Sequence, residues 1–174
     1  MNQPRILVSA CLLGEPVRYN GSAATLQHEL LKRCHRDRLL VPLCPEIAAG
    51  FETPRRPAEI VVGHTGTDIW QGRGAVVEDQ GANVTAPFRE GARIAVDTAR
   101  KAGCRFALLT DGSPSCGTNY IYSGQFDGQR RQGQGVVAAA LQEAGVRCFS
   151  QSRIGDLAEA VASFCSADDR EGTT

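Results

Sequence analysis

The stretch Arg105–Gly117, "RFALLTDGSPSCG", joins a short apolar run to a turn made of serine, proline and glycine. A continuous apolar run of this length is typical of a strand that is buried on both faces. Cys116 lies in the turn, a setting that a structural core thiol does not need. The stretch therefore predicts a buried strand over Arg105–Leu109 that is followed by a reactive or metal-binding thiol.

Two other apolar runs repeat this arrangement. Arg5–Ala10, "RILVSA", is followed by Cys11, and Leu39–Leu43, "LLVPL", is followed by Cys44. In open parallel sheets, ligands bind outside the carboxyl ends of the strands. If the three strands are neighbours, three thiols therefore converge on one site. Spacing alone leaves open a second interpretation, in which the three cysteines lie in unrelated loops.

Helical patterns separate these strands, and the strands are apolar throughout. This combination predicts an α/β fold, a single-domain three-layer sandwich with a mainly parallel, Rossmann-like sheet. Ser22 and Thr85 are candidate helix caps. We expect residues 1–165 to form one domain and residues 166–174 to form a flexible tail. The remaining predicted elements are helices over 23–36, 86–102, 136–144 and 154–164, a strand over 146–149, and a hairpin from 59–63 and 75–78.

The charge balance excludes a broad nucleic-acid interface. The chain of 174 residues has 19 Lys and Arg against 19 Asp and Glu, so its net charge is zero. Phosphate backbones are bound by an excess of basic side chains. A small anionic ligand held by a few arginines stays open. The sequence has no long apolar run and no signal peptide pattern, so we expect a cytoplasmic protein without a membrane partner.

Seven cysteines are many for a chain of this length. The odd count and the absence of an export signal disfavour a disulfide framework. Four of them lie at apolar positions of predicted helices and strands, where a thiol behaves as a small buried hydrophobe. These four are Cys34, Cys104, Cys148 and Cys165.

The other three thiols fit several kinds of chemistry. They suit a zinc ion with an open or histidine-filled fourth position, an iron–sulfur cluster with one iron free of protein ligands, or a lone thiol nucleophile. These options correspond to a hydrolase or another enzyme, or to a non-catalytic module that handles metal or sulfur. The residues alone leave the choice open.

A few polar side chains accompany the three thiols. Glu46 follows Cys44 in "CPE", where its carboxylate can activate water. Ser113 can donate, accept or relay a proton, whereas Ser115 fits ordinary turn chemistry. Four arginines can hold a phosphate or carboxylate, two of them in a Gly-rich stretch that resembles a lid: Arg55, Arg56, Arg130 and Arg131.

Seven ordered motifs resemble those of the thiouracil desulfidase family, long known only as a bacterial domain of unknown function. They are "SACLLGEPVRYNG", "PLCPE", "TPRRPAEI", "VTAPFREGA", "SPSCG", "IYSGQFDG" and "GQGVVAAAL". The resemblance covers nearly the whole chain, from about Arg5 to Ser150. The ordered set is specific, although each motif alone is weak.

The resemblance implies a [4Fe-4S] cluster on Cys11, Cys44 and Cys116, with one open iron. It also implies catalytic roles for Glu46 and Ser113. The implied reaction is a hydrolase-type, non-redox desulfidation, in which thiouracil or thiouridine monophosphate becomes the uracil form and hydrogen sulfide leaves. The implied partner is a small thiolated pyrimidine, and the zero net charge makes tRNA the least expected substrate.

Three positions depart from the family pattern. Asn20 and Asn83 stand where the family has aspartate, and Thr110 stands where a lysine is usual. Each departure removes a charge near a motif, and none affects the proposed cluster cysteines. The cluster assignment is therefore unaffected, whereas the choice of substrate stays open.

Overall fold

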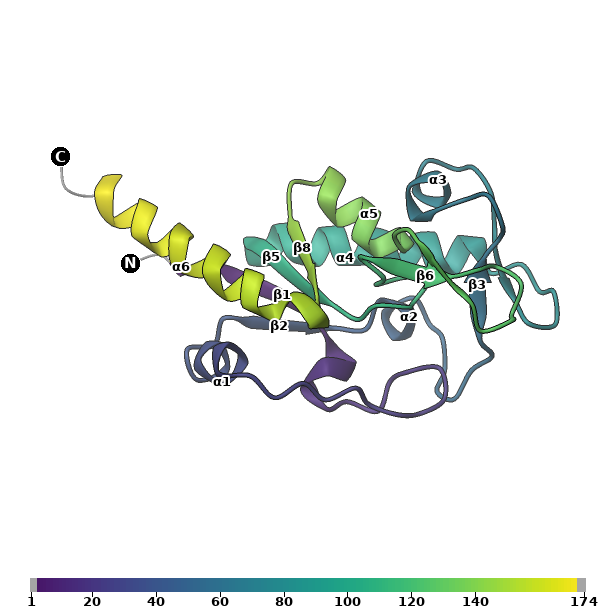
Figure 1. The fold of residues 1–174 in the computed structure, drawn as a ribbon, viewed down its shortest axis with the longest axis horizontal. Coiled ribbons are helices and arrows are strands. Elements are labelled where there is room, and N and C mark those ends of the chain that lie inside the picture. The colour runs from purple at the N-terminus through teal and green to yellow at the C-terminus, as the bar shows by residue number, and fades with distance from the viewer. Residues whose placement is uncertain (1–2, 172–174) are drawn as a thin grey trace.

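Four parallel strands form the central sheet, in the order β2–β1–β5–β8 (Figure 1). The computed structural model of the chain describes residues 3–171. In the register of the sheet, Ile6 lies between Leu40 and Phe106. The mainly parallel sheet predicted from the sequence is thus confirmed. Its strands are β1 (Arg5–Ser9), β2 (Leu40–Leu43), β5 (Cys104–Leu109) and β8 (Arg147–Ser150).

Helices cover both faces of this sheet. Leu7 of β1 packs into the core on the side of α4 (Thr85–Ala102) and α5 (Val136–Glu143). Ile6 and Val8 point the other way, into the core formed with α1 (Glu29–Arg36) and α6 (Ile154–Glu171). Successive side chains of a strand alternate between faces, so apolar strands bury both sides. The three-layer α/β sandwich is therefore confirmed.

Shorter elements extend the carboxyl edge of the sheet. The predicted hairpin is present as β3 and β4, whereas α3 and the pair of β6 and β7 were not predicted. The sequence of β7, "RRQ", has no apolar pattern and becomes a strand by pairing with β6. These elements are η1 (Ala10–Leu13), α2 (Pro45–Ala48), β3 (Ala58–Ile60), α3 (Gly66–Trp70), β4 (Val76–Glu78), β6 (Tyr120–Tyr122), β7 (Arg130–Gln132) and η2 (Gln151–Arg153).

The start of α1 differs from the prediction. The helix begins at Glu29, and Ser22 does not cap it. The backbone N–H groups of Ala24 and Leu26 donate to carbonyls of η1, each at 2.9 Å, so this segment lies along η1 and cannot form helical hydrogen bonds. His28 caps the helix instead, because its Nδ1 accepts from the Leu30 N–H at 3.1 Å.

The two ends of α4 can be compared with the caps predicted from the sequence. Gly103 ends α4 in the left-handed conformation, with φ 69°, as the sequence suggests. The first residue of α4 is Thr85, and Val84 occupies the capping position.

The last helix, α6, continues to Glu171, beyond its predicted end at Phe164, so the first part of the predicted tail is helical. Residues 172–174 lie outside the described residues. Across residues 3–171, none of the helices has the length and apolar character needed to span a bilayer.

Two helical glycines provide a test of the packing that holds α2 in place. A Cβ at Gly91 in α4 would lie 2.7 Å from the Pro45 carbonyl oxygen, whereas a Cβ at Gly155 in α6 would meet nothing within 4 Å. We expect Gly91→Ala to lower the free energy of unfolding by about 1–3 kcal/mol, because α2 must move away from α4. Gly155→Ala should raise it by about 0.5–1 kcal/mol, because alanine stabilises a helix. Urea denaturation measures the free energy of unfolding of both variants. Equal changes in the two variants would contradict the close contact between Gly91 and Pro45.

Candidate active site

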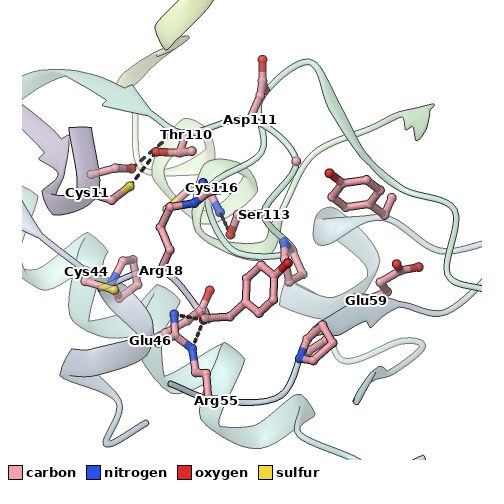
Figure 2. A pocket seen from close by; sticks show the side chains of 18 of the residues that line it. Cys11, Arg18, Cys44, Glu46, Arg55, Glu59, Thr110, Asp111, Ser113 and Cys116 are labelled. Atoms are coloured by element: carbon pink, nitrogen blue, oxygen red, sulfur yellow. Dashed lines mark hydrogen bonds and ion pairs between the residues drawn. The ribbon is translucent and has the colours of Figure 1, made fainter. Parts of the chain in front are cut away.

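A cavity of about 670 Å³ lies at the carboxyl ends of β1, β2 and β5 (Figure 2). Cys11, Cys44 and Cys116 all line it, although they come from three distant parts of the chain. Burial, and to a smaller degree the charges of Cys11 and Cys44, raises the pKa of Cys116. The structure thus brings together the three strand-end cysteines.

The environment of these thiols disfavours a lone nucleophile. Burial raises the pKa of Cys11 and of Cys44, and it raises the pKa of Cys116 well above its usual value. A thiol attacks as a thiolate, and reactive cysteines have lowered pKa values. Neutral buried thiols of this kind instead suit ligands that lose their protons when a metal binds.

The donor set suits an iron–sulfur cofactor. Cysteine thiolates are the usual ligands of iron–sulfur clusters, and three cysteines line this one cavity. Within residues 3–171, no three side chains of His, Cys, Asp or Glu are grouped closely enough to hold one metal ion.

The turn that carries Cys116 is held rigidly. Ser113 Oγ accepts from the backbone N–H groups of Ser115 at 3.0 Å and Cys116 at 3.1 Å. Asp111, just before the turn, accepts four hydrogen bonds from Thr118 and Asn119. Burial raises the pKa of Asp111, but these hydrogen bonds outweigh that effect and lower it. Cys116 is thus fixed at the wall of the cavity.

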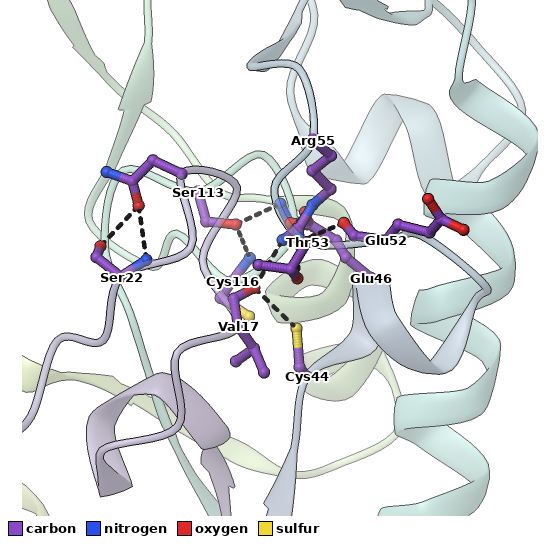
Figure 3. A network of polar contacts seen from close by, with 11 residues as sticks. Val17, Ser22, Cys44, Glu46, Glu52, Thr53, Arg55, Ser113 and Cys116 are labelled. Carbon is purple, nitrogen blue, oxygen red and sulfur yellow. Dashed lines mark hydrogen bonds and ion pairs between the residues drawn. The ribbon is translucent and has the colours of Figure 1, made fainter.

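Glu46 is held at both of its carboxylate oxygens. Its Oε2 accepts a hydrogen bond from Nε of Arg55 at 2.6 Å and forms an ion pair with Nη2 of Arg55, also at 2.6 Å (Figure 3). Its Oε1 accepts from Ser115 Oγ at 3.1 Å. The Glu46 side chain is 13% exposed and that of Arg55 is 10% exposed, so the pair is largely desolvated. The carboxylate predicted from "CPE" lies in the cavity wall with a defined orientation.

Two residues singled out in the sequence belong to this network. Arg55 lines the cavity, and its guanidinium donates to Glu46, to the carbonyls of Val17 and Glu52, and to the Thr53 hydroxyl, so its binding of substrate stays a prediction. Ser115 was assigned to turn chemistry alone, but it is buried and donates to Glu46. Both roles depend on how two loops meet in space, which the local sequence does not reveal.

The other predicted arginines separate into three cases. Arg56 lines the cavity and forms a bidentate pair with Asp79 at 2.7 and 3.0 Å. Arg130 lines the cavity and lies over the Tyr120 ring, 4.5 Å from its centroid. Arg131 is not among the lining residues, and its guanidinium donates to backbone carbonyls of residues 60, 61, 64 and 123, so its predicted contact with substrate stays untested.

Sequence reasoning missed Arg18. It lines the cavity, and in the described part of the chain its guanidinium has no carboxylate partner, only a hydrogen bond of 3.5 Å to Ser22 Oγ. It lies in the polar loop after η1, where an isolated arginine gives no signal of its own. Figure 2 shows Arg18 extending between Cys44 and Cys116, toward the interior of the cavity.

Comparisons with known proteins agree with this geometry. The model of the 2-thiouracil desulfurase family matches residues 6–153. An uncharacterized protein YbbK from Bacillus subtilis (strain 168) is 41% identical over 152 residues, which cover 87% of this chain and 99% of YbbK. A solved structure of [4Fe-4S]-dependent thiouracil desulfidase TudS has a TM-score of 0.83 at 39% identity. The match covers 92% of this chain and 99% of the TudS chain.

The buried pair of Arg55 and Glu46 leads to a stability prediction. We expect Arg55→Met to lower the free energy of unfolding by about 3 kcal/mol, because it leaves a buried carboxylate without its partner. Arg93→Met is the control, since Arg93 pairs with Glu90 and Asp97 on the exposed face of α4 and such pairs contribute up to about 1 kcal/mol. Chemical denaturation measures both variants, and a loss in Arg55→Met no larger than that of the control would contradict this assignment.

Proposed function

This chain belongs to the 2-thiouracil desulfurase family, and from that premise we propose that it is a [4Fe-4S]-dependent desulfidase. The reaction converts the thiocarbonyl of a thiolated uracil into a carbonyl and releases hydrogen sulfide. The observation that carries this proposal is the meeting of Cys11, Cys44 and Cys116 on one cavity. The solved TudS structure, similar over nearly its whole length, supports the same cofactor class.

Three thiolates suffice to hold the cofactor and leave one iron without a protein ligand. Cys11 would hold it from η1, Cys44 from the end of β2, and Cys116 from the turn after β5. When bound, the cluster supplies a Lewis acid that can draw electron density from the substrate sulfur. A fourth thiolate would block this position. The other four cysteines of the chain do not line the cavity.

Glu46 serves as the base that activates water. Its carboxylate lines the cavity, and its contacts with Arg55 and Ser115 fix its orientation. Glu46 takes one proton from water as the water oxygen bonds to the thiocarbonyl carbon. The second proton of that water then passes from the hydroxyl of the adduct to sulfur, the carbonyl forms, and the carbon–sulfur bond breaks with its electron pair on sulfur. Sulfur leaves as hydrosulfide, so no atom changes its oxidation state and no outside reductant is required.

Ser113 supplies a second polar group at the wall of the cavity. Its oxygen already accepts two backbone N–H groups, so its hydroxyl proton is directed away from the turn. Ser113 lines the cavity and can therefore donate to the pyrimidine ring or relay a proton to it. Ser113 thus holds the pyrimidine ring while Glu46 directs the water.

The cavity has room for a nucleotide. Sites of about 300–1,000 Å³ hold ligands of drug size, and this cavity of about 670 Å³ falls in that range. Arg18 and Arg130 line it without carboxylate partners in residues 3–171, so they are better phosphate ligands than Arg55 or Arg56. We therefore favour thiouridine monophosphate over free thiouracil as the substrate.

The three cysteines provide the test of the cofactor. Cys11→Ala, Cys44→Ala and Cys116→Ala should each lose the cluster absorbance after anaerobic reconstitution and lose sulfide release from thiouracil and thiouridine monophosphate. Cys148→Ala is the control, because burial raises the pKa of this thiol to about 12 and its Sγ contacts only backbone carbonyls. Full activity of Cys116→Ala would rule out the scheme.

Substitution of Glu46 tests whether its carboxylate takes the proton from water. We expect Glu46→Gln to retain its iron and sulfide content but to lose about 10²–10⁴-fold in kcat, because an amide cannot take a proton from water. Glu52→Gln is the control, since this exposed glutamate contacts Arg55 only through its backbone carbonyl. Initial rates of sulfide release measure both, and a Glu46→Gln enzyme as fast as the control would exclude this role.

A further inference from the structure

We propose that the hydroxyl of Thr110 donates a hydrogen bond to the sulfur of Cys11, and that it thereby tunes the cluster. This inference rests on the proposed function, since it concerns a thiolate that would hold the cofactor. Thr110 Oγ1 lies 3.0 Å from Cys11 Sγ, and both residues are buried (Figure 2). Thr110 is a positioning residue, because it acts through the cysteine and not on the substrate.

The direction of the Thr110 hydrogen bond follows from the chemistry of the thiolate. In the free thiol, either atom can donate. A cysteine sulfur bound to iron has no proton and can only accept. Cys11 is the one hydrogen-bond partner of the Thr110 hydroxyl among residues 3–171. Thr110 must therefore donate to Cys11 when the cluster is present.

Ser9, at the end of β1, holds Thr110 in place. Its Oγ accepts from the Thr110 N–H at 3.2 Å. Ser9 is 4% exposed and Thr110 is 7% exposed, so solvent does not compete effectively for these hydroxyls. The last residue of β1 thus orients the hydroxyl donor that directly follows β5.

Among residues 3–171, Cys44 has no side-chain hydroxyl donor of this kind. Its Sγ lies 3.9 Å from the carbonyl oxygen of Val17, which can accept a hydrogen bond but cannot donate one. Cys11 and Cys44 are therefore unequal, because a hydroxyl contacts the sulfur of Cys11 and not that of Cys44. A hydrogen bond to a ligand sulfur reduces the electron density it gives to iron and raises the reduction potential of the cluster. In a non-redox reaction, the same effect makes iron a stronger acceptor for the substrate sulfur.

The test compares reduction potentials of the reconstituted holoenzyme in an anaerobic titration followed by electron paramagnetic resonance. We expect Thr110→Val, which keeps the shape and loses the hydroxyl, to shift the potential to a more negative value. Thr110→Ser should restore the wild-type potential. Ser150→Ala is the control, because this buried hydroxyl contacts Asn119 and Ser152, away from the cysteines, and should cause no shift.

A second variant keeps the proposal testable if Thr110→Val does not hold a cluster. Thr110→Ala, which removes the same hydroxyl with a smaller side chain, should then shift the potential in the same negative direction, and resonance Raman spectra should show a stronger iron–cysteine bond as a higher stretching frequency. Potentials unchanged from wild type in the variants that hold a full cluster would overturn the proposal. A wild-type protein that binds no cluster would instead overturn the proposed function, so the two failures are distinguishable.

Discussion

The parallel pairing of β1 with both β2 and β5 is the constraint on which the site depends. In a parallel sheet, all three strands end at the same edge. Each strand is followed closely by a polar turn with a cysteine, so thiols from distant parts of the chain reach one cavity. The apolar strands are buried between two helical layers, and this packing gives the thiols a rigid and largely desolvated support.

The same edge positions the other polar side chains of the cavity. The turn after β5 carries Ser113, Ser115 and Cys116, and α2 carries Glu46 directly after β2. The hydrogen bond from Ser115 to Glu46 joins these two segments. Arg55 pairs with the buried carboxylate. Because one turn carries Cys116 and also contacts Glu46, the positions of this thiol and of this carboxylate are fixed together.

The fold and the cysteines could be predicted because their signals are local. Apolar runs identify β1, β2 and β5, and each cysteine follows its strand within a few residues. The roles of Arg55, Ser115 and Arg18 could not be predicted in this way, because each depends on which partner another loop presents. Arg55 and Arg18 differ only in that one meets a buried carboxylate and the other does not. Likewise, β7 exists through its pairing with β6 and not through its own composition.

The central claim is that three cysteines hold a [4Fe-4S] cluster whose remaining iron binds the substrate sulfur. Mössbauer spectroscopy of protein reconstituted anaerobically with ⁵⁷Fe, recorded with and without thiouracil or thiouridine monophosphate, tests it most directly. The account predicts the spectrum of a [4Fe-4S] cluster in which only one of the four irons changes when the thiolated compound is added. Absence of a cluster, or a spectrum in which no iron responds to the substrate, would contradict it.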